Sequence, residues 1–125
     1  MMDSEPQYSE ALLDHYRNPR NVGALSPADG TARRENQVCG DVLEISVGLD
    51  GDTIKEARFR AEGCIPTVAL ASFATEWAVG RKVAEAQRLD TVQLSAALGE
   101  LPSHKQHAAQ LVMETLRASI AASGH

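Results

Sequence analysis

Aromatic residues, cysteines and long apolar runs are all scarce in this chain of 125 residues. Only 4% of the residues are Phe, Trp or Tyr, so the core must be built mainly from Ala, Val, Leu and Ile. The longest apolar run, residues 68–74, is interrupted by Ser72 and is far too short to span a bilayer. The polar first seven residues lack the basic start and apolar stretch of a signal peptide. We therefore expect a cytoplasmic protein without a membrane segment.

Basic residues are also fewer than acidic residues. Lys and Arg number 12 against 17 Asp and Glu, which gives a formal net charge of −5. Because nucleic-acid binding depends on a basic face, this balance argues against nucleic acid as a partner. The two cysteines, Cys39 and Cys64, lack C-x-x-C spacing and are more typical of free or metal-bound thiols than of a disulfide. A thiol–disulfide function is accordingly the least favoured interpretation.

The length and the even composition predict a single domain over residues 1–125. Residues 8–16 predict a short helix with Ser9 as its N-cap, Leu12, Leu13 and Tyr16 near one face, and His15 on the surface. The loop-rich stretch 20–38 could add an edge strand. Strands are predicted over residues 42–49 and 53–61, joined by a turn at residues 50–52.

Helices are predicted for the second half of the chain. One runs from Pro66, at the first helical position, to about residue 79, with Leu70, Phe73, Ala74 and Trp77 buried. Shorter helices cover residues 83–88 and 91–98. Ser103 and Gln106 have capping-box spacing, which predicts a last helix from there to about residue 122. This order favours an α+β fold: a small antiparallel sheet of about three strands with helices packed on one face.

The stretch Cys39-Gly40-Asp41 places a thiol and a carboxylate two residues apart at the start of a predicted strand. Side chains two apart on a strand point the same way, so both could face one object, with Gly40 leaving room for it. A metal ion and an ordinary turn are the two alternatives.

Cys64 and His107 are further candidate ligands. Cys64 precedes a helix whose unpaired N–H groups favour the thiolate form that binds metals, although a small buried residue would also fit there. His104 and His107 lie three apart near the start of the last helix and share a face, although exposed, solvated histidines would also explain that pair. If these element ends converge at one edge of the sheet, the chain offers a four-ligand metal site: Cys39, Asp41, Cys64 and His107.

Several separated motifs resemble the NifU/IscU-type iron–sulfur cluster assembly scaffolds. The similar segments are residues 8–16, residues 18–23, Cys39-Gly40-Asp41, residues 54–59, Gly63-Cys64, Thr75-Glu76-Trp77, and Leu101-Pro102 with Lys105 and His107. They agree in order and cover the chain from Tyr8 to about Ala122. The chain is therefore identified as a member of this family.

The resemblance implies a scaffold or carrier rather than an enzyme. Such proteins host a nascent [2Fe-2S] cluster, built from iron and from sulfur that a cysteine desulfurase delivers as persulfide, and pass it to recipient iron–sulfur apoproteins. Many bind zinc when no cluster is present. Carried over by position, Cys39, Asp41, Cys64 and His107 fall on the metal and cluster ligands. The aspartate implies a labile cluster, because a carboxylate holds a soft iron–sulfur unit less firmly than a thiolate does.

Ala108 is the main departure from the family pattern. The family has a third cysteine there, which is a cluster ligand and a principal acceptor of persulfide sulfur, and alanine can serve as neither. The four remaining ligands suffice for tetrahedral zinc and are a weaker set for a [2Fe-2S] cluster. A zinc-binding interaction or regulatory module of the same fold is therefore the alternative function. His104 could replace the missing ligand.

Two further departures concern the neighbouring segments and the partners. Ile65-Pro66 stands where the family has small residues after the cysteine, which makes that turn bulkier and stiffer. Residues 101–105 differ from the usual chaperone-recognition segment, which argues against recognition by a dedicated Hsp70-type chaperone. Because Ala108 also weakens the case for a dimer around a shared cluster, we expect a monomer or a weak homodimer.

Overall fold

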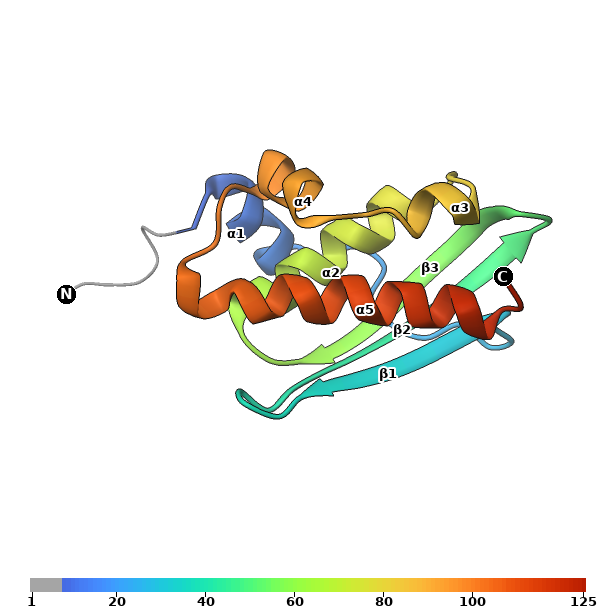
Figure 1. The fold of residues 1–125 in the computed structure, drawn as a ribbon, viewed down its shortest axis with the longest axis horizontal. Coiled ribbons are helices and arrows are strands. Elements are labelled where there is room, and N and C mark those ends of the chain that lie inside the picture. Colours follow the sequence, from blue (N-terminus) through green and yellow to red (C-terminus); the bar gives the residue numbers. More distant parts are fainter. Residues whose placement is uncertain (1–7) are drawn as a thin grey trace.

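A computed structural model describes residues 8–125 and shows two layers, a sheet and a group of helices on one of its faces (Figure 1). The strands β1 (Gly30–Asn36), β2 (Asp41–Asp50) and β3 (Thr53–Glu62) are antiparallel and pair in sequence order. The helices are α1 (Glu10–Arg17), α2 (Ile65–Ala78), α3 (Val83–Ala86), α4 (Thr91–Leu98), the 3-10 turn η2 (Ser103–Lys105) and α5 (Gln106–Ala122). The predicted α+β fold is confirmed.

Burial alternates over residues 41–45 of β2 and shows which face of the sheet meets the helices. Leu43, Ile45 and Val47 are fully buried beneath the helices, whereas Val42 and Glu44 on the other face are partly exposed. β1 is the edge strand that the sequence left open, and it pairs with β2 from Gly30 opposite Val47 to Asn36 opposite Asp41. The other edge of the sheet is partly covered, because Phe59 of β3 exchanges backbone hydrogen bonds with Asn21 and Gly23.

The helix α2 lies at the centre of the helical layer, between β3, α1 and α5 (Figure 1). Its small side chains let these neighbours approach closely, and four of its alanines are fully buried: Ala69, Ala71, Ala74 and Ala78. Leu70 and Ala74 are buried as predicted, but Phe73 and Trp77 are only partly buried because they lie at the margin of the core. Pro66 is the second residue of α2 rather than the first, since Cys64 is the N-cap.

The predicted capping box at Ser103 and Gln106 is wrong. Residues 103–105 form the turn η2, α5 begins at Gln106, and the Gln106 amide donates instead to the carbonyl of Leu101 at 3.0 Å. A capping box exists at α4, where Asp90 Oδ1 accepts from the Gln93 N–H at 2.9 Å and Gln93 Oε1 accepts from the Asp90 N–H at 3.0 Å. The sequence has the same spacing at the start of the helix predicted over residues 91–98, where we had not predicted a capping box.

His15 connects α1 to α2. It was predicted to lie on the surface, but the structure buries it. Its side chain is only 8% exposed, whereas Tyr16 beside it is 40% exposed. His15 Nδ1 lies 2.8 Å from the Ser72 hydroxyl, which also accepts a hydrogen bond from the Arg20 N–H at 2.9 Å. Burial is the main cause that lowers the pKa of His15, and the charge of Arg20 lowers it further.

The lowered pKa of His15 predicts acid sensitivity. Just below the ordinary histidine pKa of about 6.5, the unfolded chain binds a proton that the folded chain does not. The stabilising effect of neutral His15 is thus complete above that pH and is lost as the pH falls through the folded-state value. Denaturant unfolding between pH 7.5 and 5.5 should show a steeper loss of stability in the wild type than in His15→Gln. Parallel profiles would contradict this.

Candidate metal centre

Three side chains from distant parts of the sequence meet at one end of the molecule. Asp41 is the first residue of β2, Cys64 is the N-cap of α2, and His107 is the second residue of α5. These three element starts lie at the left end of Figure 1. One ligand atom from each residue can be chosen so that all three lie within 4.8 Å of one another. The structure therefore brings together three of the four residues that the sequence indicated.

The carboxylate of Asp41 is the centre of this cluster. Asp41 is only 3% exposed, and its two oxygens have different partners. Oδ1 accepts a long hydrogen bond from the Cys64 N–H at 3.3 Å, and Oδ2 accepts from the Thr67 hydroxyl at 2.8 Å. Oδ2 also lies 3.4 Å from Cys64 Sγ and 3.6 Å from His107 Nε2. Oδ2 is thus the oxygen that faces both other candidate ligands.

The ring of His107 carries a buried nitrogen that lacks a hydrogen bond. Nε2 has no partner among the described residues, and the 3.6 Å to Asp41 Oδ2 is too long for a good one. Buried polar atoms in proteins are nearly always satisfied, and a metal ion would satisfy this one. A thiolate, an imidazole and a carboxylate are also the ligand types that zinc and iron accept. The three residues therefore fit a metal.

Cys39 lies outside this cluster, exposed in the β1–β2 turn. The strand-alternation argument for Cys39 was wrong, because β2 begins only at Asp41. Asn36 Oδ1 shapes the turn, because it accepts hydrogen bonds from the N–H groups of Val38 at 2.9 Å and Cys39 at 3.2 Å. Gly40 has φ +75°, a backbone conformation that favours glycine, and a Cβ there would meet nothing within 4 Å. Glycine is therefore needed at this position for the backbone conformation of the turn and not for lack of space. A ligand role for Cys39 stays a prediction.

His104 is exposed on η2 and is not one of the three convergent residues. It does line a hollow of about 450 Å³ beside Cys64, together with Tyr8, Ile65 and Lys105. Its role as a replacement ligand also stays a prediction.

Gly63 and Thr67 support the cluster, and sequence reasoning missed both roles. A Cβ on Gly63 would lie 2.7 Å from Asp41 Oδ1 and 2.8 Å from its Cγ, so only glycine leaves space for the carboxylate. Thr67 is fully buried and contacts both Asp41 and Cys64. The available signals were the glycine directly before Cys64 and the hydroxyl three residues after it, one helical turn away.

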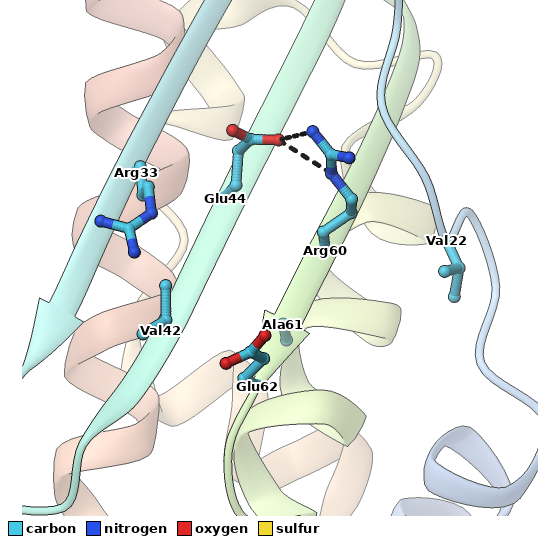
Figure 2. Close-up of a pocket in the computed structure, with 7 residues that line it drawn as sticks. All are labelled: Val22, Arg33, Val42, Glu44, Arg60, Ala61 and Glu62. Carbon is cyan, nitrogen blue, oxygen red and sulfur yellow. Dashed lines mark hydrogen bonds and ion pairs between the residues drawn. The ribbon is translucent and has the colours of Figure 1, made fainter.

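A second hollow, of about 500 Å³, lies on the sheet face that carries no helices (Figure 2). Glu44 reaches across from β2 to Arg60 on β3, and its Oε1 accepts from Nε at 3.2 Å and from Nη2 at 2.9 Å. Arg33 on β1 is directly opposite Glu44 on the other side. This surface carries the Glu44–Arg60 ion pair and contains none of the candidate ligands.

Comparison with known proteins identifies the family. The family described as "NifU-like N terminal domain" matches residues 7–123, which is nearly the whole chain. The chain belongs to this family of NifU/IscU-type scaffold proteins. It is 38% identical over 113 residues to iron-sulfur cluster assembly scaffold protein IscU 1 of Archaeoglobus fulgidus, which covers 90% of this chain and 74% of the relative. The corresponding protein of Escherichia coli is 37% identical over 118 residues, 91% of each chain.

Two solved structures share the fold. A putative iron–sulfur cluster assembly scaffold protein for the SUF system, from Fervidobacterium islandicum, superposes with a TM-score of 0.78 at 20% identity and covers 94% of this chain and 99% of its own. The N-terminal part of a NifU-like protein from Brucella abortus gives 0.75 at 13% identity, covering 93% of each. The curated relatives are named as scaffold proteins and not as enzymes, in agreement with the prediction. No helix within residues 8–125 is long and apolar enough to cross a membrane.

The space at Gly63 predicts a sensitive position. Gly63→Ala would push the new methyl group into the Asp41 carboxylate, and displacing this buried candidate ligand should lower zinc or cobalt affinity by about tenfold or more. Isothermal titration would measure this. Gly48→Ala is the matched control, because its methyl group would meet its nearest neighbour at an ordinary 3.6 Å. Equal affinities for the two variants would show that the carboxylate is not held as described.

Proposed function

We propose that this chain is an iron–sulfur cluster assembly scaffold or carrier that holds iron or a [2Fe-2S] cluster at Asp41, Cys64 and His107, with Cys39 as a fourth ligand. The observation that carries the proposal is the buried, unsatisfied His107 Nε2 beside the Asp41 carboxylate and the Cys64 thiol. Membership of a family whose relatives are named as assembly scaffolds supports it. The iron and the cluster are cargo, so the chain binds and releases them without itself turning over a substrate.

The mixed ligand set suits temporary binding. A carboxylate is a harder donor than a thiolate and holds an iron–sulfur unit less firmly, so Asp41 favours later release. Cys39, exposed at the hairpin tip, could join the bound cargo from the solvent side. The partners proposed with this role are a cysteine desulfurase that supplies sulfur as persulfide and apoproteins that receive the finished cluster.

Zinc binding without cluster assembly is the second candidate function. Two cysteines, one carboxylate and one imidazole are enough for a tetrahedral zinc site, and Ala108 beside His107 contributes no donor atom. Under this proposal the chain is an interaction or regulatory module of the same fold. Elemental analysis of the purified protein separates the two functions only together with an assembly assay, because zinc can also occupy a cluster-free scaffold.

Anaerobic reconstitution tests the leading proposal. Incubating the protein with ferrous iron, cysteine, a cysteine desulfurase and a thiol reductant, which supplies the electrons that convert persulfide sulfur to sulfide, should produce the visible charge-transfer absorption of a cluster bound by thiolates. Cys64→Ser should abolish most of this absorption, and Cys39→Ser should lower it if Cys39 is the fourth ligand.

Two outcomes of that experiment would count against the proposal. A wild-type protein that binds zinc but never develops the chromophore would favour the zinc-binding module. Unchanged absorption and metal content in Cys39→Ser would remove Cys39 from the ligand set and leave the other three residues.

Ala108 offers a gain-of-function prediction. Ala108→Cys would place a third thiol next to His107 at the start of α5, where the family pattern has one, and should increase the yield and lifetime of the reconstituted cluster. Because Ala108 is fully buried, the larger side chain should cost about 1–3 kcal/mol of folding stability. Ala109→Cys, at a buried neighbouring position, is the control for an added thiol in the wrong place. Equal yields from both variants would count against the prediction.

A further inference from the structure

Thr67 has a hydroxyl group in an unusual setting for a buried helical threonine. Thr75 and Thr115, which are also fully buried in helices, donate to a carbonyl four residues back, at 2.9 Å to Ala71 and 2.7 Å to Leu111. The Thr67 hydroxyl instead donates to Asp41 Oδ2 at 2.8 Å and lies 3.3 Å from Cys64 Sγ. Its polar group is therefore directed toward the cluster at the N-terminal end of α2 and not to a carbonyl of the helix.

This contact makes the two oxygens of Asp41 inequivalent. Oδ1 faces the backbone and accepts the Cys64 N–H, while Oδ2 is held by Thr67 on the side of Cys64 and His107. A carboxylate oxygen has more than one lone pair, so Oδ2 can keep the Thr67 hydrogen bond while it binds a metal through another. Such bonds to ligating carboxylates fix their orientation and tune their strength as donors.

We propose that Thr67 is a positioning residue, which presents Asp41 as a one-oxygen ligand through Oδ2 and keeps that oxygen close to Cys64. This inference rests on the proposed metal-binding function and adds a residue that touches the ligands without being one. Thr67 is fully buried, and its hydroxyl carries the effect. Thr67 thereby links the first turn of α2 to the first residue of β2 through the carboxylate.

Cobalt and zinc binding to the full chain tests this role. Thr67→Val keeps the side-chain shape and removes the hydroxyl, and it should weaken Co²⁺ affinity by about 10- to 100-fold and shift the visible cobalt absorption bands. Thr67→Ser keeps the hydroxyl and should bind within a few-fold of the wild type. Thr115→Val, a buried threonine remote from the cluster, is the matched control and should leave both affinity and spectrum unchanged.

A variant cycle with Asp41 distinguishes positioning from general packing. In an Asp41→Ala background, which has no side-chain oxygen to accept the Thr67 bond, Thr67→Val should cause little further loss of cobalt affinity, because the bond it removes acts through the carboxylate. Additive losses would indicate a packing effect and overturn the proposal. Should the valine variant fail to fold in a thermal melt of the metal-free protein, Thr67→Ala supports the same comparison with Thr67→Ser.

The failures of the two proposals are separable. Wild-type binding combined with equal affinities for Thr67→Val and Thr115→Val would overturn the role of Thr67 and leave the metal site intact. A weak Thr67→Ser variant, no better than Thr67→Val, would also overturn it, because the hydroxyl would then not matter. A wild-type chain that binds neither cobalt nor zinc would overturn the proposed function and this inference with it.

Discussion

The buried carboxylate of Asp41 is the group around which the β3–α2 connection and the first turn of α2 are arranged. A charged group that is almost fully removed from water must be surrounded by hydrogen-bond donors, or its burial is strongly unfavourable. The chain meets this demand with the Cys64 N–H and the Thr67 hydroxyl, and it leaves space for the carboxylate with a glycine at position 63. The β3–α2 connection is thus built around one side chain from β2, and the candidate ligands are arranged around the same oxygen.

Periodicity and turn chemistry predicted most of the fold. The β2–β3 hairpin, the edge strand and the order of the helices all appear in the structure, because burial alternates over residues 41–45 of β2 and the apolar positions repeat in α5. Helix ends were less predictable. The sequence contains the same capping spacing at Ser103 and at Asp90, and only the surrounding contacts determine that a capping box forms at Asp90. His15 was misplaced for a related reason, since its partner Ser72 is remote in the sequence.

The residues of the candidate site could be predicted from the sequence better than their arrangement in space. Asp41, Cys64 and His107 were recognisable as ligand types at the starts of elements, and these starts lie at the same end of the molecule. The position of Cys39 could not be inferred, because Cys39 lies in the turn before β2, where the alternation of side chains along a strand does not apply. The supporting roles of Gly63 and Thr67 could not be predicted from the sequence for another reason. A glycine before a cysteine and a threonine in a helix are both common, and their roles follow only from the closeness of Asp41.

The three candidate ligands come from one strand and two different helices, and this has a thermodynamic consequence. An ion held by all three would tie the sheet, α2 and α5 together, in the manner of a cross-link that exists only while the ion is present. Such an ion favours the folded chain over the unfolded chain by mass action, so its occupancy and the cohesion of the helical layer are coupled. By the same linkage, any protein that moves the first turn of α5 away from the sheet would lower the affinity of the site for the ion. Release of the ion would then depend on a conformational change as well as on ligand chemistry.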